Sequence, residues 1–219
     1  MSRGATDQGK QKKAMSENSK TILRLKAHQL DQAAEVLGRA FQNDRGLEYL
    51  VPNEAKRARL IPSFVNRVVR YCLLYGEVHT TPALEGVACW LPPSHPRPTR
   101  LRMLRTGLLT ESLKFGWAGL RKLVDIADHI ERVHKQSVPG PHWYLWWLGV
   151  EPEHQGKGIG GALMRPVLAS AEAEGLPCYL ETDNEMNVPF YRKHGFEVVS
   201  EGEVPEHGLW FWAMTRAPR

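Results

Sequence analysis

A glycine-rich loop at a strand-to-helix junction is the feature that most constrains this chain. Residues 143–150 read WYLWWLGV, a nearly continuous apolar run, and the loop QGKGIGG at 155–161 then leads into a helix expected to end at Gly175. Glycines at such a junction let the backbone approach a ligand, and the unpaired N–H groups of the helix N-terminus favour phosphate. The sequence therefore predicts either an anion-binding loop or a flexible turn that caps the helix.

A dinucleotide-binding loop of the Rossmann type is the first alternative to weigh. Gly156, Gly158 and Gly161 spell GxGxxG, and Glu181 follows about 20 residues later, as that motif requires. Residues 151–155, however, separate the strand from the first glycine, and Pro152 would end strand pairing early. The chain that follows Gly161 is too short for the remaining strands of a doubly wound domain, and the Walker A pattern is absent. We therefore reject both nucleotide-binding motifs.

The order of the other elements predicts an α/β (α+β) fold. Strands are expected at residues 22–25, 77–80, 84–91, 143–150, 178–181, 196–200 and 209–214, and helices at 31–41, 54–75, between the loop and Gly175, and 187–194. Asn53 is a suitable N-cap for the second of these helices, and Pro62 within it predicts a kink or an altered start. Because the strands are continuously apolar, we expect a sheet covered on both faces.

Residues 99–136 predict a basic helical region in two pieces, ended by Pro139-Gly140-Pro141. The second piece places six apolar residues on one stripe, with charged residues opposite: Leu113, Trp117, Leu120, Val124, Ala127 and Ile130. Such a region can cover a pocket as a lid or wall, or pair with a second copy of the chain.

The net charge of +5 is carried by the N-terminal segment. Residues 1–26 hold seven Lys and Arg against Asp7 and Glu17, so 7 − 2 = +5, and the rest of the chain is neutral. Residues 1–20 are nearly devoid of apolar side chains, which predicts a disordered basic tail. A basic tail alone gives only nonspecific, salt-sensitive binding, so we expect no specific nucleic-acid partner.

Two further classes of protein are disfavoured by the sequence. No apolar run reaches the ~20 residues that a membrane span needs, so no membrane partner is expected. The three cysteines, Cys72, Cys89 and Cys178, are far apart and odd in number, which argues against a disulfide scaffold and favours a cytoplasmic location. The nine histidines show no ligand spacing, so no metal site is expected.

The loop resembles the acetyl-CoA-binding motif of the Gcn5-related N-acetyltransferase (GNAT) superfamily, Gln/Arg-x-x-Gly-x-Gly/Ala, which Gln155, Gly158 and Gly160 satisfy. The resemblance continues through residues 179–182 and 187–196, and residues 143–219 look most like puromycin N-acetyltransferases. It implies a mixed, mostly antiparallel central sheet, splayed between its fourth and fifth strands, with helices on both faces. It also implies one domain over 21–219, with 92–141 as a helical insertion between the third and fourth strands and 143–219 as the acetyl-CoA-binding and catalytic core.

By the same resemblance, two backbone segments would bind acetyl-CoA. The pantetheine arm would pair with Leu148, Gly149 and Val150, while the pyrophosphate would lie on the amides of Gln155, Gly156, Lys157, Gly158, Ile159, Gly160 and Gly161. The Lys157 side chain would either add charge at a phosphate or remain solvated. Asn187 would contact the arm, cap the following helix, or do both.

Transfer of an acetyl group to an amine needs a base for the ammonium and an acid near the sulfur. Tyr191 matches the family's proton-donating tyrosine, the alternative being a core aromatic residue. Glu181, in an otherwise apolar strand, is the candidate base, the alternative being a structural ion pair; Asp183 is the alternative base or an anchor for the acceptor. Strand alternation sends Trp146 and Trp147 to opposite faces, so that one of them, Trp146, would line the acceptor pocket.

The resemblance predicts an N-acetyltransferase that moves an acetyl group from acetyl-CoA, as cosubstrate, directly to a primary amine of a small molecule, with antibiotics and other xenobiotics as candidate acceptors. A protein or peptide N-acetyltransferase and a non-catalytic CoA-binding sensor are the alternatives. A monomer or homodimer is expected.

Overall fold

The computed structural model describes residues 21–219, and the predicted basic tail at 1–20 lies outside them. In the described part, one sheet has the strand order β1-β2-β3-β4-β5-β7-β6. Its strands are β1 (Leu23–Arg24), β2 (Glu77–Thr80), β3 (Gly86–Leu91), β4 (Trp143–Val150), β5 (Cys178–Thr182), β6 (Glu197–Val204) and β7 (Leu209–Arg216). All neighbouring pairs are antiparallel except β4 and β5, which are parallel. The mixed, mostly antiparallel sheet predicted from the sequence is confirmed.

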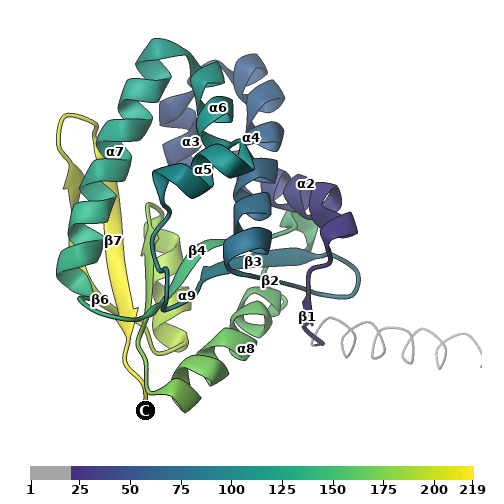
Figure 1. The fold of residues 1–219 in the computed structure, drawn as a ribbon, viewed down its shortest axis with the longest axis vertical. Coiled ribbons are helices and arrows are strands. Elements are labelled where there is room, and N and C mark those ends of the chain that lie inside the picture. The colour runs from purple at the N-terminus through teal and green to yellow at the C-terminus, as the bar shows by residue number, and fades with distance from the viewer. Residues whose placement is uncertain (1–20) are drawn as a thin grey trace, which may run out of the picture.

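Helices cover both faces of this sheet (Figure 1). One face packs against α2 (Leu30–Ala40), α3 (Arg45–Leu50), α4 (Glu54–Tyr75) and the insertion helices α5 (Arg100–Thr106), α6 (Leu108–Ser112) and α7 (Gly116–Ser137). The other face packs against α8 (Ile159–Glu174) and α9 (Val188–Lys193). Short 3₁₀ turns lie at residues 27–29, 113–115, 152–154 and 185–187.

The fourth and fifth strands separate after a short paired stretch. Only residues 143–145 of β4 pair with residues 178–180 of β5, and the last pair is Leu145 with Leu180. The β4 residues beyond that point pair with β3 alone, Leu148 with Ala88 and Val150 with Gly86. The predicted splay is therefore confirmed, and one backbone edge of β4 lies open at its carboxyl end.

A β-bulge overturns the predicted orientation of the two tryptophans. The register between β3 and β4 shifts between Cys89 and Trp90, so that Trp146 has no partner residue on β3. Because the extra residue interrupts the alternation of side chains, Trp146 and Trp147 both pack against the same apolar cluster. The Trp146 ring centroid lies 5.3 Å from that of Tyr71 on α4, and the Trp147 centroid lies 4.6 Å from that of Phe41 after α2.

Several element boundaries differ from the sequence prediction. β3 begins at Gly86 instead of residue 84, because Leu84 has a φ of 56° in the preceding turn. α3 was not predicted; it is a six-residue helix whose N-cap, Asp44, accepts a hydrogen bond from the Leu47 amide. α4 has the predicted bounds and continues through Pro62. β6 extends four residues beyond its predicted end.

The insertion consists of three helices instead of two pieces, and its apolar stripe is only partly buried. Leu113 is 60% exposed, Trp117 84% and Val124 45%, although the stripe predicts a core-facing side. Among residues 21–219, no helix combines the length and apolar character needed to cross a membrane.

Candidate active site at the split between two strands

The loop after β4 has a backbone that only glycine adopts readily. Gly156 and Gly158 have φ values of 73° and 82°, in the left-handed region, and no atom lies within 4 Å of a Cβ built on either. α8 begins at Ile159, directly after these glycines, so its unpaired amides face this open loop. The residues predicted to hold a pyrophosphate therefore have the geometry of an anion-binding loop.

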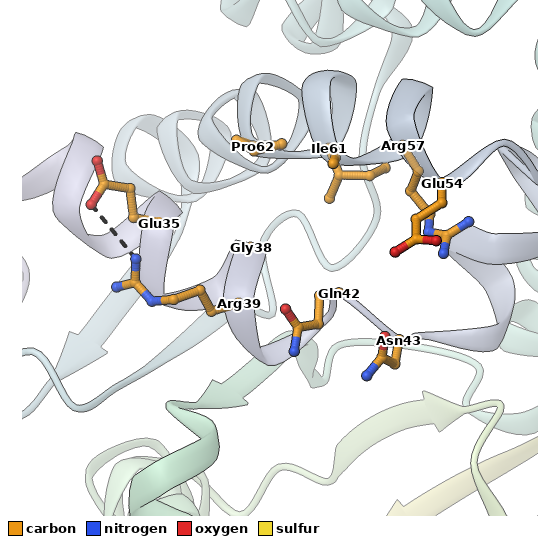
Figure 2. A pocket seen from close by; sticks show the side chains of 10 residues that line it. Glu35, Gly38, Arg39, Gln42, Asn43, Glu54, Arg57, Ile61 and Pro62 are labelled. Atoms are coloured by element: carbon orange, nitrogen blue, oxygen red, sulfur yellow. Dashed lines mark ion pairs between the residues drawn. The ribbon is translucent and has the colours of Figure 1, made fainter.

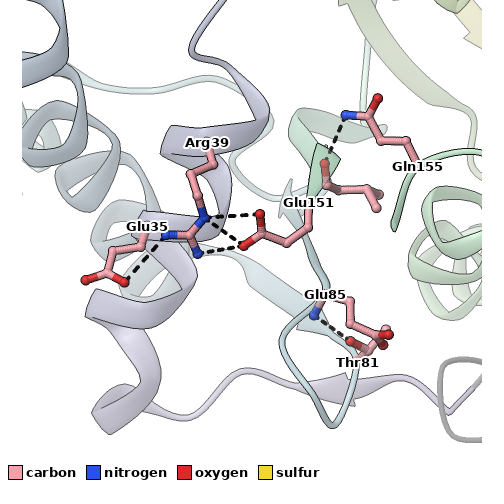
Figure 3. Close-up of polar contacts among 7 residues, drawn as sticks. Glu35, Arg39, Thr81, Glu85, Glu151 and Gln155 are labelled. Carbon is pink, nitrogen blue, oxygen red and sulfur yellow. Dashed lines mark hydrogen bonds and ion pairs between the residues drawn. The ribbon is translucent and has the colours of Figure 1, made fainter. Parts of the chain in front are cut away.

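Side chains around the loop hold it against the end of β4 (Figure 3). The Gln155 side-chain amide donates a 3.1 Å hydrogen bond to the Val150 carbonyl. Arg39 on α2 binds the Glu151 carboxylate through Nε and Nη2, at 3.0 Å and 2.6 Å from Oε1. Gln155 thus has a structural role in closing the loop.

Packing leaves no room for a side chain at Gly161 and little room at Gly160, which the motif alone does not show. A Cβ on Gly161 would lie 2.5 Å from Cε1 of His194, and one on Gly160 would lie 3.2 Å from Cζ of Phe190. The absence of side chains at these positions lets α9 and the residue that follows it lie against the first turn of α8. The buried Ile159 side chain points into the core, so only its amide can serve a ligand.

The open edge of β4 is the second feature that fits acetyl-CoA. Leu148, Gly149 and Val150 pair with β3 on one side and have no β5 partner on the other. A Cβ on Gly149 would lie 2.7 Å from the Leu37 side chain and 2.9 Å from the Ala40 side chain, both on α2. The absence of a side chain at Gly149 therefore lets α2 pack closely beside this edge. An extended arm can therefore pair with these residues as an added strand does.

Glu181 lies one residue beyond the last β4–β5 pair, at the point where the strands divide. Its side chain is 9% exposed, and burial raises the pKa of the carboxyl to about 7, although the nearby Tyr144 and Tyr179 hydroxyls act in the opposite direction. Within residues 21–219, Oε1 has no hydrogen-bond partner. A buried carboxyl with a pKa near neutrality is suited to accept a proton.

A pair of carboxyl groups lies just beyond the end of β5. Asp183 Oδ2 accepts a 2.9 Å hydrogen bond from the Gly46 amide of α3, and Asp44 caps the same helix. Burial, together with the charge of Asp183, raises the pKa of Asp44 to about 7, and burial raises that of Asp183. Asp44 was not predicted as a site residue, because no local motif marks a residue so distant in the sequence.

Tyr191 is buried on α9, with its ring centroid 5.1 Å from Phe190 and 6.0 Å from Phe196. Burial, and to a lesser extent the charge of Asp183, raises the pKa of its hydroxyl above the ordinary value. Asn187 is the N-cap residue of α9, but its side chain does not cap the helix; its amide donates instead to Thr182 Oγ1 at 3.2 Å. The hydroxyl of Tyr191 therefore stays protonated at neutral pH, as a proton donor must.

The insertion helix α7 packs across several elements near this site. α7 contacts α3 as well as β6 and β7. Tyr49 on α3 hydrogen-bonds through its hydroxyl to His207 Nδ1 in the β6–β7 turn at 2.8 Å, and Lys122 on α7 lies 4.0 Å from the Tyr49 ring centroid. α7 therefore forms a wall that joins the two halves of the split sheet.

A groove of about 300 Å³ between α2 and α4 is a separate feature (Figure 2). Glu35, Arg39, Gln42, Glu54 and Arg57 are among the residues that line it, and none of the predicted site residues does. No group of three or more His, Cys, Asp or Glu residues in the described part of the chain is placed to hold a metal ion. The candidate site is therefore the split, not the groove.

Comparison with known proteins agrees with this geometry. Residues 114–196 match the family model described as the acetyltransferase (GNAT) family. An uncharacterised N-acetyltransferase of Schizosaccharomyces pombe is 28% identical over 79% of this chain and 72% of its own length. A mycothiol acetyltransferase of Streptomyces avermitilis is 39% identical, but over 32% of this chain and 23% of its own length.

Among solved structures, one described as histone acetyltransferase HPA2 and related acetyltransferase, from Corynebacterium glutamicum, superposes with a TM-score of 0.63 at 20% identity, covering 91% of this chain and 96% of the other. That likeness establishes the fold. The chain is thus similar in fold to a solved acetyltransferase structure, and over residues 114–196 it is similar in sequence to the acetyltransferase (GNAT) family model.

Proposed function

We propose that this protein transfers an acetyl group from acetyl-CoA directly to the primary amine of a small molecule. The observation that carries the proposal is the position of Glu181, a buried carboxyl with a raised pKa at the division of β4 and β5. The edge formed by Leu148, Gly149 and Val150 would bind the pantetheine arm, and the amides at 155–161 the pyrophosphate. Bound acetyl-CoA supplies the thioester that the amine attacks.

Glu181 and Tyr191 divide the proton transfers between them. Glu181 accepts a proton from the incoming ammonium, which frees the nitrogen lone pair for attack on the thioester carbonyl. The nitrogen–carbon bond forms, the carbon–sulfur bond breaks, and Tyr191 donates a proton to the departing sulfur. The nitrogen then loses its second proton, which restores the Tyr191 hydroxyl. Asn187, tied to Thr182, would contact the arm, and Lys157 would add charge beside the phosphates.

The surroundings of the split favour a cationic and bulky acceptor. Asp44 and Asp183 provide negative charge next to the site, and Trp146 contributes an aromatic surface. α7 walls this side, which suits a small-molecule acceptor. A protein or peptide acceptor would need an open groove instead. The likeness of residues 143–219 to puromycin N-acetyltransferases points in the same direction. The three cysteines are buried and free, which supports a cytoplasmic location, and we expect a monomer or homodimer.

The test is release of CoA thiol from acetyl-CoA in the presence of an amine panel. The panel contains arylalkylamines, aminonucleosides, simple alkylamines and a peptide with a free N-terminus. Turnover with the bulky small amines, and none with the peptide, is expected. Turnover with the peptide alone would support the protein or peptide enzyme, and binding of acetyl-CoA with no turnover would support a sensor. Failure to bind acetyl-CoA would rule the proposal out.

The role of the carboxyl pair can be tested with Asp44→Asn. At pH 8, above the raised pKa of Asp44, loss of its charge should raise KM for a cationic amine at least about tenfold and leave KM for acetyl-CoA unchanged, since a charge-assisted contact contributes on the order of 1.5–3 kcal/mol. Asp128→Asn on the exposed side of α7 is the matched control. An unchanged KM for the amine in Asp44→Asn would remove Asp44 from acceptor binding.

A further inference from the structure

The insertion helix α7 carries apolar side chains on two different sides. This long helix runs along one side of the molecule (Figure 1). Its inner side faces the core, where Leu123, Ile126 and Val133 pack against the larger apolar cluster. Gly119 and His134, on the same side, are buried. The core contacts of α7 are therefore made without its remaining apolar residues.

The second apolar set lies on the side of α7 that faces solvent. Trp117 is 84% exposed and Val124 45% exposed, Ala127 is exposed as well, and Leu120 is half-buried. The successive spacings of three, four and three residues are those of the a and d positions in a heptad repeat. We call this set the exposed strip: Trp117, Leu120, Val124 and Ala127. An exposed apolar strip that is bordered by charged residues is typical of a protein–protein contact.

The exposed charges beside the strip are segregated along the helix. Arg121 lies near the start of α7 and Lys114 lies in the turn just before it, and more than half of each side chain is exposed. Basic residues return only beyond the strip, at Arg132 and Lys135. Three exposed acidic residues occupy the stretch between: Asp125, Asp128 and Glu131. A parallel pair of such helices would bring like charges together, whereas an antiparallel pair brings the basic end of each helix to the acidic stretch of the other.

Antiparallel pairing also matches the sizes of the side chains in the strip. With a two-fold axis beside residue 122, midway along the strip, Trp117 lies opposite Ala127 of the second copy. The largest side chain of the strip then faces the smallest, as close packing requires. Leu120 lies opposite Val124 of the second copy by the same symmetry. Each contact occurs twice, because the two copies use the same surface.

We propose that two copies of this chain pair through the exposed strips of their α7 helices, antiparallel about a two-fold axis beside residue 122. The pairing covers Trp117, a residue type that often dominates the binding energy of an interface. It also places Arg121 of each copy near Asp128 of the other. Of the monomer and homodimer expected from the sequence, this arrangement selects the homodimer. The inference is independent of the proposed function, because no residue of the exposed strip belongs to the candidate active site.

The oligomeric state of the full-length chain is the first test. Sedimentation velocity at up to about 100 μM, which spans the micromolar affinities of weak specific interfaces, should show a dimer in the wild type. Trp117→Glu should raise the dimer Kd about 30-fold or more, the effect expected for loss of an aromatic residue at the centre of an interface. Leu74→Glu is the matched control, since Leu74 is 58% exposed on α4 and lies outside the strip.

The outcomes of this first test are distinct. Circular dichroism establishes that each variant is folded. A wild type that is monomeric throughout, or a dimer that folded Trp117→Glu leaves intact, would overturn the proposal. A monomeric wild type that binds vesicles of phosphatidylserine would assign the strip to an anionic membrane surface and would overturn it equally. Acetyl transfer enters none of these measurements, so the dimer is tested whether or not the protein acetylates an amine.

The orientation of the two helices is tested with Arg121→Glu and Asp128→Lys. Each variant alone sets like charges against each other twice in the antiparallel dimer, so each should dimerise more weakly than the wild type. An equimolar mixture restores opposite charges at both contacts and should form heterodimers with wild-type affinity. A mixture no tighter than the separate variants would refute the arrangement. A mixture tighter than the wild type, with the separate variants unchanged, would indicate parallel pairing and would also refute it.

Discussion

At the scale of single residues, the site concentrates acidic groups that are shielded from water. Glu181, Asp44 and Asp183 all have raised pKa values, and burial is the largest cause for each. Their neutral forms therefore persist to higher pH than in exposed carboxyl groups. This has consequences for stability as well as for catalysis, because the folded chain holds these protons more tightly than the unfolded chain does.

Glu181→Gln should stabilise the protein at high pH. The pKa of Glu181 rises from 4.5 unfolded to about 7 folded, so its contribution to stability is complete below pH 4.5 and is lost as the pH rises through 7. Glutamine does not titrate, so the variant should unfold with a free energy about 3 kcal/mol higher than wild type at pH 8, and about 1 kcal/mol higher at pH 5.

Urea unfolding at the two pH values measures this difference, with the exposed Glu153→Gln as control. An equal difference at pH 5 and pH 8 would contradict the raised pKa. The same Glu181→Gln variant should lack the limb of the kcat profile near pH 7.

Tyr191→Phe separates proton donation from binding. Removal of the hydroxyl leaves the ring between Phe190 and Phe196 in place, so acetyl-CoA affinity should be unchanged. We expect kcat to fall about 100-fold or more, the range for loss of a general acid. Steady-state kinetics and calorimetric binding report the two quantities, and Tyr75→Phe on α4 is the control. Wild-type turnover in Tyr191→Phe would exclude Tyr191 as the proton donor.

At the scale of elements, α8 and α9 fit together because two glycines carry no side chains. In Gly161→Ala the new methyl would meet the His194 ring at 2.5 Å, and this contact should lower the free energy of unfolding by about 1–3 kcal/mol. Urea unfolding in the absence of ligand measures the effect. Gly202→Ala on β6 is the control, since no atom lies within 4 Å of its Cβ position. Equal stability of the two variants would contradict the packing role.

The elements that sequence patterns predict best are the long periodic ones. The bounds of β2, β4 and α4 were predicted correctly, and the splayed sheet followed from the motif at Gln155, Gly158 and Gly160. α3 was missed because six residues are too few to show a helical period. The orientation of Trp147 was wrong because a one-residue bulge leaves no sign in the hydrophobic pattern.

The site residues also fall into two groups, those that a sequence motif marks and those that only the fold brings to the site. The loop residues, Glu181 and Tyr191 lie within segments that resemble the family, and Asp183 directly follows one of them. The sequence therefore predicts their roles, which remain to be tested. Asp44 comes from a segment without a motif, and only the fold brings it beside β5. Contacts between residues so far apart in the chain depend on packing that no local pattern encodes.

At the scale of the whole molecule, acetyl-CoA binding should stabilise the fold. A ligand at 100 times its Kd adds about 2.7 kcal/mol to the free energy of unfolding. Thermal unfolding should therefore shift upward with acetyl-CoA and much less with pantetheine at equal concentration, because pantetheine lacks the pyrophosphate that the loop at 155–161 would hold. Equal shifts for the two ligands would argue against the loop as the phosphate site.

The scarcity of β4–β5 pairs has a consequence for how the molecule unfolds. Three residue pairs are few backbone links between β1–β4 and β5–β7, so the two parts depend on side-chain packing to unfold together. α7 leaves the first half and packs on β6 and β7 of the second. We therefore expect the insertion to help the sheet unfold in a single cooperative transition, although few hydrogen bonds link β4 to β5.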